Sequence, residues 1–393
     1  MREGVFLKND LNVKLISMED IMEAKCCDIQ EVIRVIEEVL VDYKNGGVML
    51  PDKISQIFNL ETQDRINCMP STLMKDGVCG IKWVSVFPEN PHKFSSQNVS
   101  GVIILSELEQ GFPIAVMDGT LITALRTACM GAIGAKYLAR KDSHIYGTIG
   151  SGEQAKAHFV AIKQMFPQID TCYVASRSGK GENQFIDIMK KKYPDVDFIP
   201  CNSDYDKAAQ NADIIVTAVS CQEPLLKADA VKNGTYYCHV GGWEDEYAVP
   251  QKATKIVCDD WHSLKHRGSP TIARMYKDGL LSMSSIIDDF QAILLCNSIN
   301  FLYITKISVN MYRHNSNRTI RNKALNLCDI NSIIFLINVT ENWNQAISNN
   351  CVCSRCKSKR CSNHFTAFWQ VQRCDNILQC QMAICIKSHM RYS

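Results

Sequence analysis

The chain has 393 residues, enough for two domains, and its 46% hydrophobic content is ordinary for a globular protein. The formal net charge is only +2, so the whole chain lacks the strong positive charge typical of nucleic-acid binding. Its first residues lack the apolar core of a signal peptide, and no run approaches the roughly 18 apolar residues of a membrane-spanning helix. With mostly scattered cysteines, these features predict a cytoplasmic protein with reduced thiols.

Residues 1–121 predict an α+β domain of helices and antiparallel strands. Apolar residues recur at helical spacing over 28–44, and Asn45-Gly46-Gly47 ends that helix. Runs rich in Ile and Val predict three strands, of which the last two form a hairpin: 80–86, 101–108 and 112–117.

Residues 122–290 predict a second domain, in which strands and helices alternate. A long helix rich in Ala and Leu, over 121–139, leads into it. The alternation implies a parallel sheet with right-handed crossovers, which is a doubly wound α/β (Rossmann) domain. The expected strands are 144–149, 171–175, 197–199, 213–218, 235–240 and 255–258, and the expected helices are 153–165, 183–193, 205–211 and 271–277.

A glycine turn between the first strand and the first helix of this domain predicts a dinucleotide site. Gly150 allows the tight turn, and Gly152 lets the backbone approach the phosphates. The helix that follows directs free N–H groups and its positive dipole end at the anion. Ala155 is small where the helix must pack closely on the strand.

The end of the second strand bears on the choice of cofactor. An acid there often binds the ribose hydroxyl of NAD, whereas a basic residue often pairs with the 2′-phosphate of NADP. This chain has Ser176-Arg177-Ser178, with Lys180 nearby and no acid. The cofactor is therefore NADP or NAD, with NADP favoured. The alternatives are an arginine that stacks on the adenine of NAD and a solvated loop.

Six segments, in this order and spacing, resemble the ornithine cyclodeaminase/mu-crystallin family of NAD(P)-dependent enzymes. They are Met69-Pro70, 80–90, 121–128, 149–155, 212–219 and 239–242. The segment from Lys82 to Asn90 also resembles the branch that oxidises N-(carboxyalkyl) amino acids. The resemblance implies a homodimer whose first domain binds substrate and forms the dimer. It also implies hydride transfer at the α-carbon of an amino acid, through an imine.

The resemblance gives roles to particular residues. Lys82 becomes a residue that binds substrate and moves protons, although a lone strand lysine is more often solvated. Arg126 becomes a clamp on the substrate carboxylate or the cofactor, with an intramolecular ion pair as the alternative. Lys53 stands where the family commonly has a carboxylate-binding arginine. The expected cofactor-binding residues are Arg126, Gly150, Ser151, Gly152, Glu153, Gln154, Ser176, Arg177, Thr217, His239 and Val240.

The chain departs from the family pattern at Trp243. Cyclodeaminases have a catalytic aspartate directly after two glycines, but here Gly242 is followed by an indole, which cannot act as a base. We assign the proton-transfer role to Asp245, within the acidic run 244–246. The alternative is that these acids form a solvated turn without a catalytic role. Because Trp243 replaces that aspartate, the full cyclodeaminase cycle is less favoured than simple redox between amine and imine.

Residues 291–393 predict an atypical, disordered tail. Residues 297–393 hold 12 Lys/Arg and 3 Asp/Glu, and the last glycine and proline of the chain are Gly279 and Pro270. Our hypothesis is an altered reading frame near codon 290. The alternative is a zinc-binding, nucleic-acid-binding knuckle formed by Cys353, Cys356, Cys361 and His364. We predict no metal site.

Two functions of different class follow. The first is an NAD(P)-dependent enzyme acting on a small amino acid or cyclic imine, either an ornithine cyclodeaminase or an amino acid dehydrogenase or ketimine reductase. The second is a non-catalytic NADPH-binding protein similar to mu-crystallin. Lys82 and Arg126 favour the enzyme, whereas Trp243 and the tail favour the alternative. Neither function involves nucleic acid or a membrane.

Overall fold

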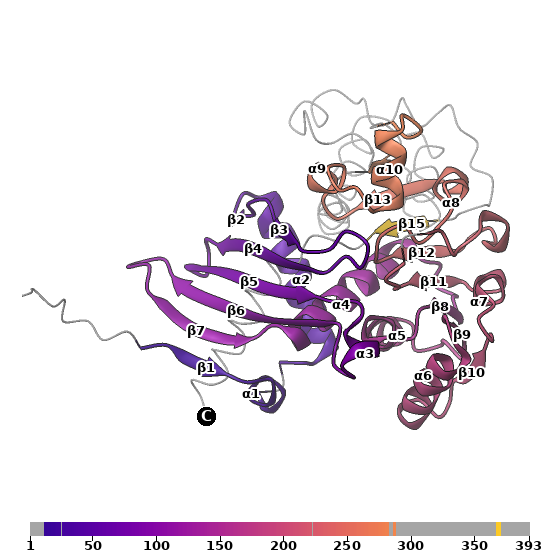
Figure 1. Ribbon diagram of the computed structural model, residues 1–393, viewed down its shortest axis with the longest axis horizontal. Coiled ribbons are helices and arrows are strands. Elements are labelled where there is room, and N and C mark those ends of the chain that lie inside the picture. Colours follow the sequence, from indigo (N-terminus) through magenta and orange to yellow (C-terminus); the bar gives the residue numbers. More distant parts are fainter. Residues whose placement is uncertain (1–11, 25, 222, 283–285, 288–366, 371–393) are drawn as a thin grey trace, which may run out of the picture. The chain divides into compact units, whose positions relative to one another are not determined.

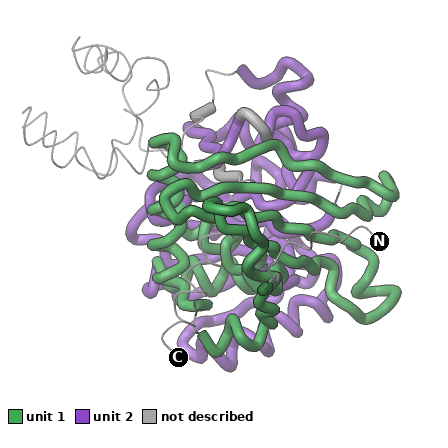
Figure 2. The backbone as a smooth tube through the Cα atoms, turned by 90° about the vertical axis from the view of Figure 1, so that its left-hand side faces the viewer, with its two compact units in different colours: residues 1–133, 156–165, 373–393 green, residues 134–155, 166–372 purple. Residues whose placement is uncertain are grey.

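The computed structural model describes residues 12–24, 26–221, 223–282, 286–287 and 367–370 (Figure 1). It divides into two compact units, coloured in Figure 2. Unit 1 holds residues up to Ile133 and residues 156–165, and unit 2 holds residues 134–155 and 166–372. The change of unit at Ile133 falls within one long helix, whereas the sequence predicts a boundary at 121/122. Except for 367–370, the predictions for the tail concern residues outside those described.

Unit 1 is built around a seven-stranded sheet in the order β1-β7-β6-β5-β4-β2, with β3 also paired to β4. The central strands are antiparallel, and β6 and β7 form the expected hairpin. The strands are β1 (Lys14–Ile16), β2 (Val48–Met49), β3 (Ile54–Ile57), β4 (Arg65–Leu73), β5 (Val78–Val86), β6 (Val99–Glu107) and β7 (Pro113–Asp118). The helices are α1 (Met18–Glu23), α2 (Ile29–Lys44), α3 (Asn90–Lys93) and α4 (Thr120–Leu138).

The two faces of this sheet differ in burial. Val78, Lys82 and Val84 of β5 are buried, while Trp83, which points to the other face, is 40% exposed. This alternation is the two-residue period of a strand whose one face is covered. The inward position places the Lys82 side chain under the helices rather than in solvent.

Unit 2 contains an eight-stranded parallel sheet in the order β10-β9-β8-β11-β12-β15-β13-β14. The run β10-β9-β8-β11-β12 is the order 3-2-1-4-5 of a doubly wound nucleotide-binding sheet, which confirms the predicted fold class. The strands are β8 (Ile145–Ile149), β9 (Thr171–Ala175), β10 (Asp197–Pro200), β11 (Ile214–Thr217), β12 (Tyr236–His239), β13 (Lys255–Cys258), β14 (Ile286–Ile287) and β15 (Ala367–Gln370). The helices that follow β8 in the chain are α5 (Glu153–Met165), of which residues 156–165 belong to unit 1, α6 (Gly179–Lys192), α7 (Tyr205–Gln210), the 3₁₀ helix η1 (Ala228–Ala230), α8 (Ala248–Lys252), α9 (Trp261–Leu264) and α10 (Thr271–Lys277).

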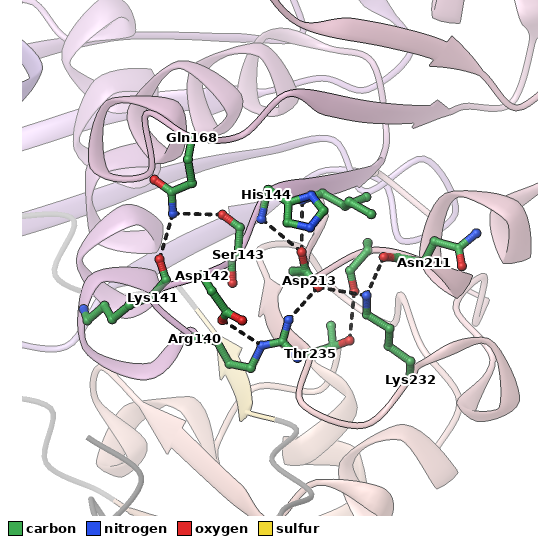
Figure 3. A network of polar contacts seen from close by, with 12 residues as sticks. Arg140, Lys141, Asp142, Ser143, His144, Gln168, Asn211, Asp213, Lys232 and Thr235 are labelled. Carbon is green, nitrogen blue, oxygen red and sulfur yellow. Dashed lines mark hydrogen bonds and ion pairs between the residues drawn. The ribbon is translucent and has the colours of Figure 1, made fainter. Parts of the chain in front are cut away.

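A single buried carboxylate joins the amino ends of the central strands (Figure 3). The N–H groups of His144 and Ile145 donate to Asp213 Oδ2, each over 3.0 Å. The Asp213 Oδ1 atom accepts from Arg140 at 3.0 Å and from Lys232 at 2.8 Å. This network satisfies backbone donors at the edge of β8 and leaves the opposite, carboxyl edge of the sheet for ligands.

Six of the described strands are not expected from the sequence: β1, β2, β3, β4, β14 and β15. Strand β4 is hidden in the pattern because its inward positions include the polar residues Asn67 and Ser71. Strand β15 comes from the tail and pairs with β12 on one side and β13 on the other. Among the described helices, none is both long and apolar enough to cross a bilayer.

Candidate active site

The first group of candidate residues lies in unit 1 around Lys82. Strand β5 holds this lysine between Met69 of β4 and Ile103 of β6, on the covered face of the sheet. Lys82 is only 2% exposed, so the alternative of a solvated strand lysine is wrong. Its Nζ atom donates to Thr123 Oγ1 over 3.4 Å, which joins β5 to helix α4.

Helix α4 contributes the partners of this lysine. Thr123 and Arg126 stand three residues apart, so they share one helix face. The Thr123 hydroxyl donates to the Gly119 carbonyl at 2.5 Å, which leaves its lone pairs for the Lys82 ammonium. Arg126 is 5% exposed, so its charge is almost completely removed from water.

The electrostatics of this group lower the basicity of Lys82. Burial lowers the pKa of Lys82 well below its usual value of 10.5 because a buried ammonium loses its hydration. The positive charges of Arg126 and Lys53 lower that pKa further. The cluster therefore combines cations that suit a carboxylate with an amine that can exist uncharged and accept a proton. Sequence reasoning identified these three cations, but it missed Thr123.

The glycine turn of unit 2 has the geometry of a phosphate-binding loop. Gly150 follows β8 with φ +117°, a conformation that L residues rarely adopt. A Cβ atom at Gly150 would lie 2.5 Å from the Ala218 carbonyl oxygen. At Gly152 a Cβ would meet no atom within 4 Å, so the backbone at the start of α5 is open to a ligand. These features fit the pyrophosphate of a dinucleotide, and α5 supplies the N–H groups.

The loop after β9 holds the two residues that bear on cofactor choice. Ser176 is buried, and its hydroxyl donates to the Ser178 carbonyl at 2.8 Å, whereas Arg177 is exposed. Glu182 of α6 is fully buried and accepts the N–H groups of Ser176, Asn202 and Ser203 over 2.8–3.0 Å. Glu182 is therefore committed to backbone N–H groups, and its role was missed from the sequence.

A buried polar cluster lies at the carboxyl ends of β11 and β12. It contains the imidazole of His239 and the carboxylates of Glu244 and Asp245, each with no exposed surface. His239 Nε2 lies 3.0 Å from Glu244 Oε2, and His239 Nδ1 lies 3.8 Å from Asp245 Oδ1. The alternative of a solvated acidic turn is therefore wrong for Glu244 and Asp245. Glu246 is half-buried and accepts a separate hydrogen bond from the Ala228 N–H at 3.3 Å.

Asp245 is enclosed rather than open to a ligand. Its Oδ1 atom accepts from Thr271 Oγ1 at 2.7 Å and from the Tyr237 hydroxyl at 3.4 Å. Burial raises the pKa of Asp245 to about 6. This enclosure weighs against direct contact with a substrate, and the catalytic role of Asp245 stays a prediction. The guanidinium carbon of Arg274 lies over the ring of the neighbouring Trp243, 4.1 Å from the centroid of that ring.

The remaining cofactor predictions fall at the same edge of the sheet. Thr217 is fully buried, and its hydroxyl donates to Glu244 Oε2 at 2.8 Å, so it is already engaged inside the protein. The side chain of His239 contacts Glu244. Val240, which follows at the end of the strand, is half-buried and is therefore the more accessible of the two to a cofactor. Ser151, Glu153 and Gln154 surround the open turn at Gly152 and are at most half-buried.

The comparisons with known proteins agree with this geometry. The model of the ornithine cyclodeaminase/mu-crystallin family matches residues 12–276. The chain belongs to this family. An alanine dehydrogenase from Archaeoglobus fulgidus is 32% identical over 275 residues, covering 69% of this chain and 78% of that protein.

Two further similarities concern the same family. N-((2S)-2-amino-2-carboxyethyl)-L-glutamate dehydrogenase from Staphylococcus aureus is 30% identical over 224 residues, covering 57% of this chain and 66% of that protein. An archaeal alanine dehydrogenase dimer with bound NAD has a TM-score of 0.71 at 22% identity, covering 97% of this chain and 96% of that chain. Family membership and these dehydrogenase relatives confirm the prediction of an NAD(P)-dependent enzyme over a non-catalytic binding protein.

Proposed function

We propose that this enzyme catalyses reversible hydride transfer at the α-carbon of an amino acid, through an imine. The observation that carries the proposal is the buried Lys82 beside the cations Arg126 and Lys53. Such a group pairs with a carboxylate through Arg126 and offers Lys82 as a proton acceptor. The relatives that are named alanine dehydrogenase and N-((2S)-2-amino-2-carboxyethyl)-L-glutamate dehydrogenase support an amino acid or N-(carboxyalkyl) amino acid substrate.

The residues of unit 1 perform the proton chemistry. Uncharged Lys82 accepts the proton that the substrate ammonium must lose before its α-carbon can become an imine carbon. Arg126 and Lys53 hold the substrate carboxylate, and its negative charge offsets the repulsion among the three cations. In the opposite direction, protonated Lys82 returns its proton to the substrate nitrogen. Thr123 orients the Lys82 amine through the 3.4 Å contact.

The residues of unit 2 fit a nicotinamide dinucleotide. Gly150, Ser151, Gly152 and the amides at the start of α5 would hold the pyrophosphate, because Gly152 leaves that backbone open. Val240 and the backbone after β11 and β12 would border the nicotinamide. When bound, the cofactor accepts or supplies the hydride.

Simple redox is favoured over the full cyclodeaminase cycle. Trp243 replaces a base, and the two acids that follow it are completely buried. Cyclisation and loss of ammonia need further proton transfers between the substrate nitrogens, for which a base must reach the reacting centre. Lys82 alone suffices for the proton transfer between amine and imine.

The test is a substrate panel with NAD⁺ and NADP⁺. Alanine, ornithine, lysine and an N-(carboxyalkyl) amino acid are each incubated with the protein, and reduced nicotinamide and ammonia are measured. We expect net cofactor reduction with at least one of them. Proline and ammonia from ornithine without net reduction would establish the cyclodeaminase instead. Dinucleotide binding without any turnover, including that of cyclic imines in the reductive direction, would refute an enzymatic role.

We propose that NADP is the preferred cofactor. Arg177 is exposed beside Ser176 and Ser178, and Glu182, the nearest buried acid, is committed to backbone N–H groups. Replacing Arg177 by alanine should lower kcat/KM for NADPH by about 10–100-fold, because a charged hydrogen bond to phosphate is worth about 1.5–3 kcal/mol. The value for NADH should stay within about twofold. The matched control is Lys191→Ala, which removes an exposed cation near the carboxyl end of α6. Equal losses with both cofactors would contradict the proposal.

We propose that the protein is a homodimer formed through the outer face of the unit 1 sheet. Leu15 of β1, Trp83 of β5 and Val102 and Ile104 of β6 are 81%, 40%, 42% and 37% exposed. The register pairs Trp83 with Val102, so these side chains share one face. An apolar sheet face of this kind marks an interface, and the archaeal alanine dehydrogenase is a dimer.

The double variant Val102→Asp/Ile104→Asp should be a monomer, because dimerisation would bury two carboxylates without partners. Sedimentation measures the mass, and Ile188→Asp, a change at a 47% exposed residue of α6, should remain dimeric. A dimeric double variant would place the interface elsewhere.

We also propose that the protein is located in the cytoplasm. The ten cysteines of the described residues are all free thiols, which supports this location.

A further inference from the structure

We propose that Glu244 is a positioning residue whose carboxylate bridges the loops after β11 and β12 and thereby shapes the nicotinamide end of the cofactor site. This inference rests on the proposed dinucleotide site. It differs from the roles predicted for Asp245, because Glu244 acts through the backbone that it holds and does not contact the reacting atoms.

Each carboxylate oxygen of Glu244 serves a different loop. The Val219 N–H, after β11, donates to Oε1 over 2.8 Å. The Gly241 N–H, after β12, donates to Oε2 over 2.8 Å. The Thr217 hydroxyl also donates to Oε2 at 2.8 Å. One buried anion thus satisfies backbone donors from two adjacent strand ends, which are costly to leave unpaired.

The glycines at these strand ends fit closely around the bridge. A Cβ atom at Gly241 would lie 2.4 Å from Glu244 Oε1 and 2.7 Å from the Val219 carbonyl oxygen. A Cβ atom at Gly150 would lie 2.5 Å from the carbonyl oxygen of Ala218, the residue before Val219. The phosphate turn therefore packs against the loop after β11, and that loop packs against the loop after β12. Glu244 holds the loops after β11 and β12 together.

The surroundings keep Glu244 ionised. Burial acts to raise its pKa, but the charge and hydrogen bond of His239 and the two backbone N–H groups outweigh burial, so the pKa is lowered. His239 in turn has a raised pKa, which fits an imidazolium between Glu244 and Asp245. The other titratable groups that respond to the Glu244 charge are Tyr237, Cys221 and Cys238. None of these groups supplies a second cation.

The placement of the bridge connects it with the cofactor. Strands β8, β11 and β12 are neighbours in a parallel sheet, and ligands of doubly wound folds bind at the carboxyl ends of such strands. A contact that shifts by about 1 Å in a cofactor site is enough to weaken hydride transfer. Loss of the bridge should therefore affect both cofactor binding and turnover.

The test compares Glu244→Gln and Glu244→Asp with Glu246→Gln. Glutamine keeps one acceptor oxygen but sets an NH₂ group against one of the two backbone donors. Aspartate keeps the charge but is too short to bridge both loops. Each should raise the Kd for NADPH, measured by nicotinamide fluorescence, by about 10-fold and lower kcat by a similar factor, since one buried hydrogen bond is lost. Glu246→Gln, which alters only the bond to the Ala228 N–H, should bind as the unaltered protein does.

A second measurement uses the unaltered protein, in case a variant fails to fold. Hydrogen exchange should show the Val219 and Gly241 amides to be protected. Fast exchange at either amide, or a folded Glu244→Gln variant with unchanged Kd and kcat, would overturn the inference. Failure of the unaltered protein to bind either dinucleotide would overturn the proposed function instead, and the exchange result would still decide whether the bridge exists.

Discussion

Replacing Lys82 by methionine should lower kcat for amino acid oxidation by about 10²–10⁴-fold, the usual contribution of a positioned acid–base group. Methionine has a similar length but cannot accept a proton. Because Lys82 is buried among cations, its removal should leave the fold intact. Lys53→Met should instead raise KM for the substrate, with a smaller effect on kcat. A Lys82→Met variant that retains more than about a tenth of kcat would exclude Lys82 as the proton acceptor.

The pH dependence of the unaltered enzyme provides a second measurement of the same residue. The pKa of Lys82 is lowered from 10.5, and oxidation requires the uncharged amine. The oxidation rate should therefore rise with pH to a plateau that is reached below pH 10.5, and the reductive rate should fall over the same range. In Lys82→Met, both the rise of the oxidation rate and the fall of the reductive rate over this pH range should disappear.

The Lys82→Met substitution should raise stability although it lowers activity. Between the folded-state pKa of Lys82 and 10.5 the unfolded chain binds more protons, so the stability of the unaltered protein rises with pH across that window. Lys82→Met should therefore be more stable, by about 1–2 kcal/mol near neutral pH, with a smaller advantage as the pH approaches 10.5. Urea unfolding at several pH values measures this difference. A destabilised variant would show that Lys82 serves the fold.

Replacing Gly150 by alanine should abolish measurable dinucleotide binding, with a Kd raised by at least about 100-fold. Alanine at φ +117° is strained, and its Cβ would lie 2.5 Å from the Ala218 carbonyl oxygen, so the turn must move. Strain of this kind also costs about 1–3 kcal/mol of stability. Isothermal titration with NADPH and thermal unfolding measure the two effects.

Gly152→Ala separates the two consequences, because no protein atom lies within 4 Å of its Cβ position. This variant should unfold at the same temperature as the unaltered protein, yet bind NADPH more weakly, since the added methyl occupies the space that a pyrophosphate would approach. Unaltered binding by Gly152→Ala would show that this backbone does not contact the cofactor.

The parts of the fold that could be predicted are those governed by short-range pattern. Helix α5 and strands β9 and β13 have the predicted bounds, because each is a compact apolar or amphipathic run with a clear break at both ends. The turn at Gly150 was likewise evident from its neighbours alone. The family resemblance identified Lys82 as a candidate. The apolar residues around it in the sequence did not predict that its side chain is buried.

The buried acids could not be predicted, since their burial depends on donors that are distant in sequence. Glu244 accepts from Val219 and Glu182 from Asn202, residues on other loops of the same sheet edge. In the sequence, Glu244 stands in an acidic run that is typical of a solvated turn. Only the meeting of strand ends in a parallel sheet supplies the N–H groups that make such burial favourable.

The position of β15 has a consequence for biosynthesis. This strand lies between β12 and β13, yet residues 259–366 separate it from β13 along the chain. During translation, β8 to β12 leave the ribosome first and can assemble from near neighbours. The far side of β12 remains an unpaired edge until residues 367–370 have been made, and such edges promote association between nascent chains. Closure of the sheet is therefore expected to be late and to limit the yield of folded protein.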